Sequence, residues 1–297
     1  MSYLSEWFVR RRGLANGILF SGLSVAGILF PLLFPPLIAR FGPAKLVRGY
    51  ALALLVGMVP ALLFVKPRLP EPRVRGPHPR ARRARDWLRE RNFWFFAAIN
   101  TVQGLGYFVP IIWLPTYASS LGFSATKGAL TLALFNAAGY VACFGVGFLS
   151  DTYDVWGLAV LSLVLTASAT LVLWGVLASS LAGILVYSGV YGAVAGGFSS
   201  LWSAFTRPIA RDDPTLTTTI FGYMLLTRGI GNIVSTPIST ALQQVHSATR
   251  AGSAHQTGFA VSDGRYQDMI IYSGACSAGA ALIAVVGWTL DRRQRSG

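Results

Sequence analysis

Residues 155–206 form the longest uncharged stretch of the chain and read VWGLAVLSLVLTASATLVLWGVLASSLAGILVYSGVYGAVAGGFSSLWSAFT. As a single α-helix this stretch would measure about 78 Å, because an α-helix rises about 1.5 Å per residue. The hydrocarbon core of a bilayer is only about 30 Å thick. We therefore expect the stretch to cross a membrane twice, with its turn at the weakest helical point, Ala178–Gly183.

The whole chain has the composition of a membrane protein. Hydrophobic residues make up 53% of its 297 residues and charged residues 12%, about half of the charged share that is usual in soluble domains. This composition excludes disordered, collagen-like and disulfide-scaffold proteins. Between the charged loops lie uncharged runs that can each supply the roughly 20 helical residues needed to cross a bilayer. We expect an all-α polytopic membrane protein with about eight transmembrane helices, at 13–39, 45–65, 93–117, 128–149, 156–177, 181–205, 217–242 and 268–290.

The basic residues predict how these helices are oriented. With eight spans both termini share one side, and that side carries most of the 25 Lys and Arg residues. Because Lys and Arg gather in cytoplasmic loops, we expect the lead-in 1–12, the basic loop 66–92 and the tail 291–297 in the cytoplasm. A basic loop of this kind favours anionic lipid headgroups over nucleic acid.

Arg228 is the ionisable residue that falls inside a predicted span, whereas every Asp and Glu lies in a loop or at a span end. A charge in a span is costly and marks a candidate functional site. At helical spacing Arg228 shares a polar stripe with Gly231, Asn232, Ser235 and Ser239. The stripe predicts either a helix that lines a watery cavity, with Arg228 attracting an anionic group, or an Arg that only bonds backbone carbonyls of a neighbouring helix.

Other polar or aromatic side chains lie within the third, fourth and sixth spans. At membrane depth such groups either bond across helices or contact a solute, and both interpretations stay open. The candidate solute-binding residues are therefore Arg228, Asn232, Asn100, Gln103, Tyr107, Asn136 and Tyr191.

The sequence shows no constellation for catalysis or metal binding. A membrane hydrolase needs paired buried carboxylates, a buried His set or a nucleophile beside a base. The three His lie in loops without metal-ligand spacing. Cys143 and Cys276 fall within spans and are typical of small apolar packing residues. We expect neither an enzyme nor a cofactor nor a bound metal.

Several strings, in order along the chain, carry a family resemblance. They are WFVRRRGLANG at 7–17, GYFVPIIWLPTYA at 106–118, GFLSD at 147–151 and RGIGNIVSTPIS at 228–239. Together they resemble fungal monocarboxylate-porter-like members of the major facilitator superfamily, and Gly147 and Asp151 are similar to that superfamily's conformational-loop signature. Cys143, eight residues before Asp151, departs from the Arg that the family usually has there.

The resemblance implies twelve helices in two bundles, with the solute passing between them. On that basis 13–65 would be the last two helices of the N-terminal bundle and 93–290 a complete six-helix C-terminal bundle. The chain would then be N-terminally truncated, without the family's first-helix motif. The likeness also implies a multi-pass protein of the plasma membrane.

Two functional hypotheses follow. The first is a secondary carrier that moves a small organic anion, such as a monocarboxylate or a related metabolite, by alternating access. The alternative is a truncated membrane protein that does not transport, acting as a scaffold or sensor, or a half-transporter whose missing helices come from another chain.

Overall fold

The structure, a computed structural model, describes residues 12–63, 86–210, 214–244 and 257–296, and all the regular structure in these ranges is helical. Residues 1–11 of the expected lead-in, 66–85 of the expected basic loop and Gly297 of the tail lie outside the described residues. The longer helices are α2 (Arg12–Phe41), α3 (Pro43–Leu62), α5 (Arg91–Ser120), α6 (Ala125–Ser150), α7 (Val155–Ser168), α8 (Leu181–Ala195), α9 (Trp202–Ala210), α10 (Pro214–Gln244) and α11 (Gln267–Ser296). Short helical segments are η1 (Asp86–Arg89), η2 (Ala169–Leu177), η3 (Gly196–Leu201) and η5 (Gly258–Ala260).

A helix occupies each of the eight predicted ranges, so the all-α membrane fold is confirmed. Six helical units in the described residues are long and apolar enough to cross a bilayer: α3, α5, α6, α7 with η2, α8 through α9, and α11. In helix α2 the range Val25–Phe41 forms a shorter apolar helix. Helix α10 has 31 residues but is more polar, because it carries Arg228, Asn232 and several Thr and Ser.

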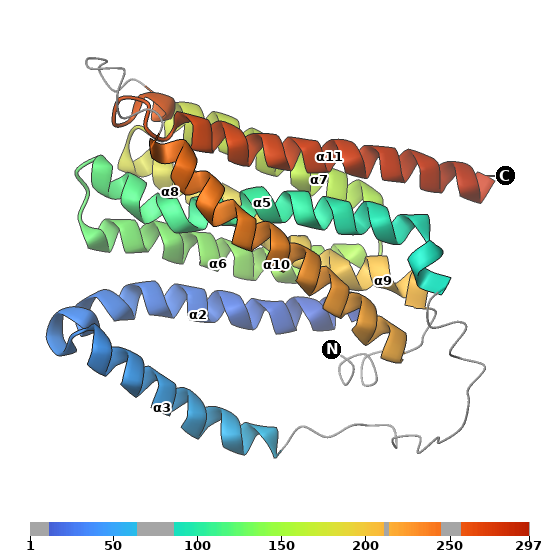
Figure 1. The fold of residues 1–297 in the computed structure, drawn as a ribbon, viewed down its shortest axis with the longest axis horizontal. Helices are drawn as coiled ribbons and strands as arrows, with labels where there is room; N and C mark the ends of the chain where they lie inside the picture. The colour runs from blue at the N-terminus through green and yellow to red at the C-terminus, as the bar shows by residue number, and fades with distance from the viewer. Residues whose placement is uncertain (1–11, 64–85, 211–213, 245–256, 297) are drawn as a thin grey trace.

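The long helices lie side by side, and α10 crosses α5 at a slant (Figure 1). Helices α2, α5 and α10 begin at one end of the bundle, where α11 also ends; we call this the terminal end (Figure 1). Helix α2 packs along α6, whereas α3 contacts α2 and buries none of its residues. The pair α2–α3 is therefore peripheral to a bundle formed by α5 to α11.

Aromatic side chains build the core of this bundle in two clusters. The first lies toward the terminal end and includes Phe96, Trp156, Trp202 and Phe205. The second lies toward the opposite end and includes Tyr117, Trp174, Tyr187, Tyr191 and Tyr266. Buried aromatic rings supply large packing contacts, so each half of the bundle has its own aromatic core.

Two of the crossing helices change their hydrogen-bonding pattern partway along. Helix α7 continues into the π-helical segment η2, and α8 continues through the 3₁₀ segment η3 into α9. The six residues of η3 exceed the three to four that 3₁₀ runs usually have, and such a run inside a helix often marks a functional hinge. The residue that follows η3 is Trp202, which contributes to the site described next.

Candidate solute-binding site

Arg228 lies near the middle of α10 and is surrounded by an amide and two aromatic rings. Its Nη1 donates a hydrogen bond to Oε1 of Gln103 on α5, at 2.7 Å. Its Cζ lies 4.4 Å from the centre of the Tyr107 ring and 5.9 Å from that of Trp202. Within the described ranges no carboxylate forms an ion pair with Arg228. We call Arg228, Gln103, Tyr107 and Trp202 the Arg228 cluster.

The chemistry of this cluster suits an anion. A guanidinium has five N–H donors in a planar fork and no acceptor, and Gln103 accepts from only one of its nitrogens. The fork matches a carboxylate, which can accept two parallel hydrogen bonds from it. The two rings are attracted to the cation through their negatively charged faces, but neither neutralises it. An anionic solute would supply the charge that the described residues do not.

Two amides fix the helix that carries Arg228. Asn100 Nδ2 on α5 donates to the carbonyl of Met224 (2.7 Å) and to Thr227 Oγ1 (2.9 Å). In the orientation that satisfies its amide, Asn232 Nδ2 donates to the carbonyls of Arg228 (3.3 Å) and Gly104 (3.2 Å). The bonds from Asn100 and the bond from Asn232 to Gly104 cross between α5 and α10, on either side of Arg228 along the chain, whereas the bond from Asn232 to Arg228 lies within α10. Asn100 and Asn232 therefore position the guanidinium.

The polar stripe of α10 lies mainly against α5, which differs from the prediction of a stripe that lines a watery cavity. Gly231, Ser235 and Ser239 are all buried. A Cβ added at Gly231 would lie 2.6 Å from the carbonyl oxygen of Thr101 on α5, and Ser239 Oγ accepts from Trp113 Nε1 at 3.1 Å. The small residues of the stripe thus allow close packing of two helices, and Arg228 and Asn232 are its half-buried members.

Tyr191 contacts the Arg228 cluster through Tyr107. It is fully buried, its hydroxyl donates to the backbone carbonyl of Tyr107 at 3.2 Å, and the two rings stack with centres 6.3 Å apart. Tyr191 thereby orients the part of α5 that carries Tyr107. Tyr191 belongs to the second core cluster, and no hydrogen bond or cation–π contact joins it to Arg228 in the described residues.

Asn136 lies apart from the Arg228 cluster. Its Nδ2 donates to the carbonyl of Gly27 on α2 (3.1 Å) and to that of Leu132 on its own helix (2.8 Å). A side chain at Gly27 would overlap the Asn136 amide. The structure therefore places Asn136 in the interface between α2 and α6, where it joins the peripheral pair to the bundle.

Trp202 is the member of the cluster that the sequence did not identify as a binding residue. It is buried at the start of α9 and approaches Phe221 of α10 as well as Arg228. One signal was available: an aromatic residue shortly after Gly196 and Gly197, within the longest uncharged run. Helical periodicity could not place it, because the intervening segment is not α-helical.

The predicted conformational loop contacts the start of α2. Gly147 is buried in the last turns of α6, and Asp151 follows the end of that helix. Asp151 Oδ2 accepts the backbone N–H of Leu14 at 3.3 Å. The first N–H groups of a helix have no partner within the helix and carry partial positive charge, so a carboxylate is stabilised there. This bond links the α6–α7 loop to the peripheral pair.

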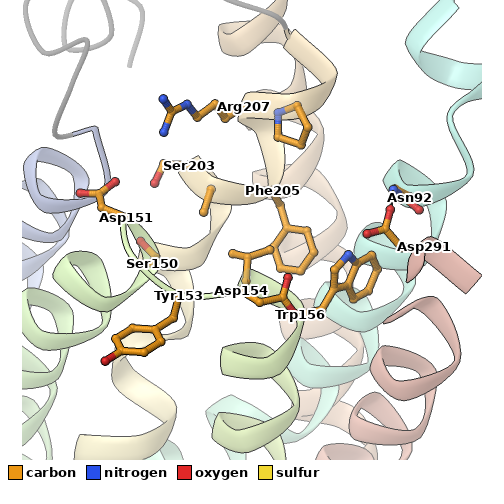
Figure 2. A pocket seen from close by; sticks show the side chains of 13 residues that line it. Asn92, Ser150, Asp151, Tyr153, Asp154, Trp156, Ser203, Phe205, Arg207 and Asp291 are labelled. Carbon is orange, nitrogen blue, oxygen red and sulfur yellow. Dashed lines mark hydrogen bonds between the residues drawn. The ribbon is translucent and has the colours of Figure 1, made fainter. Parts of the chain in front are cut away.

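A cavity of about 610 Å³ adjoins this loop at the terminal end. Figure 2 shows Asp151 and Arg207 on one side of it and Asn92 with Asp291 on the other. Asn92 Nδ2 donates to Asp291 Oδ1 at 2.6 Å, and Asp291 is only 6% exposed. Charges of both signs line this cavity, unlike the Arg228 cluster. Among the described residues no group of three His, Cys, Asp or Glu is placed to hold a metal ion.

A second hollow, of about 550 Å³, is almost entirely apolar and lies where α2 meets α5 and α6. Phe30, Phe34 and Pro35 of α2 face Pro115 and Leu132 across it. Arg228 lines neither hollow. Arg228 itself is half-buried.

Comparison with known proteins identifies the family of this architecture. The sequence pattern of the Major Facilitator Superfamily matches residues 1–236. Over 96% of its length the chain is 28% identical to the MFS transporter asaE of Aspergillus flavus, covering 60% of that protein. It is 28% identical to the fujikurins efflux protein of Gibberella fujikuroi over 69% of this chain and 43% of the relative. It is 26% identical to the aspyridones efflux protein apdF of Emericella nidulans, over 82% and 48% respectively.

These figures show that the chain spans roughly half of the length of the curated relatives it matches. The predicted superfamily is confirmed by the matched pattern. The finer prediction of a monocarboxylate-porter-like protein is not confirmed, because these relatives are named as a transporter and as efflux proteins, without mention of monocarboxylates.

Proposed function

Because the chain belongs to the major facilitator superfamily, we propose that it acts, by itself or as part of a larger assembly, as a secondary carrier for an organic anion. Carriers of this kind bind solute near the middle of the membrane and expose the site to each side in turn. The proposed site is the Arg228 cluster, and the acidic group of the solute binds the Arg228 guanidinium.

The observation that carries this proposal is a mid-helix guanidinium without a carboxylate partner in the described residues. An intramembrane charge is normally paired or functional. Gln103 satisfies one donor and leaves the charge uncompensated. An Arg with a purely structural role would be expected to bond backbone carbonyls of a neighbouring helix, whereas this one bonds a side-chain amide and faces two rings.

We propose a solute with one acidic group and an apolar body, which includes aromatic monocarboxylates. Tyr107 and Trp202 flank the guanidinium, and aromatic rings of this kind bind flat or apolar groups by stacking. Two relatives are named as efflux proteins, for fujikurins and for aspyridones. We therefore propose that transport runs outward across the plasma membrane.

The test uses a matched pair of probes, benzoate and its neutral analogue benzamide. Binding of each is measured by equilibrium dialysis with the purified chain in lipid nanodiscs, and flux with the chain in proteoliposomes. We expect benzoate to bind more tightly than benzamide, and Arg228→Gln to remove that difference. Equal binding of the two probes, or unchanged preference for benzoate in Arg228→Gln, would refute the anion site.

A second candidate is a carrier or scaffold assembled with further helices. The observation that favours it is α3, which buries no residue and has its main contacts in the described elements with its neighbour α2. Helices from another polypeptide would cover this face. Light scattering on the detergent-solubilised protein tests it: a particle containing only the 31.9 kDa chain excludes a stable partner, and absence of benzoate flux in such a particle favours the non-transporting alternative.

The orientation in the membrane is also a proposal. We infer that the terminal end faces the cytoplasm, because the sequence places most Lys and Arg on that side. An epitope tag after Gly297 and a second within 66–92 should both be protected from added protease in intact cells. Digestion of either tag without permeabilisation would overturn this orientation.

A further inference from the structure

The 3₁₀ segment η3 lies between two helices that both support the Arg228 cluster. On one side, α8 carries Tyr191, whose hydroxyl bonds the backbone of Tyr107. On the other side, α9 begins with Trp202, whose ring faces Arg228. The angle and rotation between α8 and α9 are set by η3. The geometry of η3 therefore decides whether Trp202 and Tyr107 can face the guanidinium together.

Cys143 of α6 contacts η3 at two points. Its thiol donates a weak hydrogen bond to the carbonyl of Gly196 at the start of η3, with sulfur and oxygen 3.6 Å apart. Its backbone carbonyl accepts the hydroxyl of Ser200, near the end of η3, at 3.2 Å. Both Cys143 and Ser200 are buried. One residue of α6 thus holds the two ends of the 3₁₀ segment.

The backbones of α6 and η3 approach closely at the same place. A Cβ added at Gly196 would lie 2.8 Å from Cα of Gly139, and one at Gly197 would lie 3.0 Å from the carbonyl oxygen of Ala142. This approach is what brings the Cys143 carbonyl within reach of Ser200. The close packing already fixes where η3 lies along α6. The two hydrogen bonds therefore stabilise the 3₁₀ conformation of η3 and are not needed to fix its position.

We propose that Cys143 and Ser200 are positioning residues that hold η3 in its 3₁₀ form and thereby place the Trp202 ring against Arg228. Any effect of Cys143 and Ser200 on solute binding rests on the proposed function. Their effect on the contact between Trp202 and Arg228 does not depend on it.

The proposal is tested without any solute, by ¹⁹F NMR of the full chain labelled with 5-fluorotryptophan. The chain has eight Trp residues, and the Trp202 resonance is the one that disappears in Trp202→Phe. It should shift in Arg228→Gln, because the nearby charge is removed. We expect Cys143→Ala and Ser200→Ala to shift the same resonance and to leave those of Trp87 and Trp288, assigned in the same way, unchanged.

Two matched variants separate positioning from general packing. Ser188→Ala removes another buried hydroxyl of the same span, one that bonds its own helix at the carbonyl of Ile184, and it should leave the Trp202 resonance in place. Cys143→Ser keeps a donor at the same position and should restore the resonance that Cys143→Ala shifts. An unshifted Trp202 resonance in Cys143→Ala and Ser200→Ala overturns the proposal, as does an equal shift in Ser188→Ala.

A labelling measurement covers the case in which Cys143→Ala does not fold. In a Cys276→Ala background Cys143 is the single thiol, and its rate of reaction with a maleimide reports how often η3 opens. Ser200→Ala should raise this rate about fivefold, as expected when one hydrogen bond no longer holds the closed form. An unchanged rate overturns the proposal. If the Trp202 resonance behaves as expected in the variants but the protein does not bind benzoate, only the proposed function is refuted.

Discussion

The Arg228 cluster and the cavity at the terminal end both contain charged side chains, but they differ in how the charges are compensated. In the cavity, Asp291 accepts a hydrogen bond from Asn92, and Arg207 shares the lining with several carboxylates. In the cluster, one guanidinium has an amide and two rings as its partners. Charged groups of both signs lie together in the first region, whereas no carboxylate of the described residues accompanies the guanidinium in the second.

This difference separates structural from ligand-binding polar groups in a membrane protein. Buried charges destabilise a fold unless they are paired or hydrogen-bonded. Where partners lie in the same chain, their loss should lower stability and leave binding alone. Where a partner is supplied by a solute, the loss of the charge should lower binding and leave the fold intact. Substitutions in the cavity should therefore lower stability without changing binding, and substitutions in the Arg228 cluster should lower binding with little change in stability.

The largest effect is expected from Arg228→Ala. Benzoate affinity should fall about 100-fold, because hydrogen bonds to a charged group contribute about 1.5–3 kcal/mol each. Membrane insertion should be retained, and thermal stability should fall only slightly, since the neutral amide of Gln103 loses its donor but no carboxylate of the described residues loses a partner. Equilibrium dialysis and a thermal unfolding curve measure the two quantities. If stability collapsed while affinity persisted, Arg228 would belong with the structural charges.

Asn92→Ala should show the opposite signature. Asp291 would lose its amide donor while staying buried, so the free energy of unfolding should fall by about 2 kcal/mol. Benzoate affinity should not change. Asn136→Ala is the matched control, because its amide bonds only backbone carbonyls, and interhelical bonds in membranes contribute about 0.6 kcal/mol. Denaturation in graded SDS ranks the two variants, and an equal loss would argue against a special role for the buried carboxylate.

Tyr107 tests the aromatic part of the comparison. Tyr107→Ala should weaken benzoate binding several-fold, since a cation–π contact contributes about 0.5–2 kcal/mol, whereas Tyr107→Phe keeps the ring and should bind nearly normally. The same dialysis assay measures both. Equal losses in the two variants would show that the hydroxyl, and not the ring, is what matters at this position.

The smallest effect is expected at the contact between the α6–α7 loop and α2. Asp151→Asn removes the negative charge at the start of α2, which is worth about 0.3–1 kcal/mol. Hydrogen exchange at the Leu14 amide should accelerate about two- to fivefold by this estimate. Asp154→Asn is the control, because Asp154 accepts from Gly157 at the start of α7 instead. Faster exchange of Leu14 in both variants would indicate a general loosening of the loop.

The sequence predicted the helices, and three of its candidate binding residues are members of the Arg228 cluster. Arg228 was identified because a charge within an apolar run is rare, and Gln103 and Tyr107 because polar groups recur in the third span; the structure brings all three together. Long apolar runs determine where helices form whatever their neighbours are, which is why each predicted range contains a helix.

What could not be predicted depends on contacts between distant segments. The spacing of Gly231, Ser235 and Ser239 shows that they share a face, but not that this face meets α5. The partner of Asn136 lies on α2, far away in the sequence. The 3₁₀ form of η3, which places Trp202, depends on Cys143 and Ser200 meeting across two helices. Periodicity along one helix contains no information about any of these.

The close approach of α6 to α8 and η3 also bears on how natural variation in this protein should be interpreted. At Gly192 and Gly196 even a methyl group would collide with the α6 backbone. In a survey of all single substitutions scored by growth, these two positions would appear as intolerant as Arg228, although they touch no solute. Only a survey that scores the amount of folded protein separately from flux would distinguish the two kinds of intolerance.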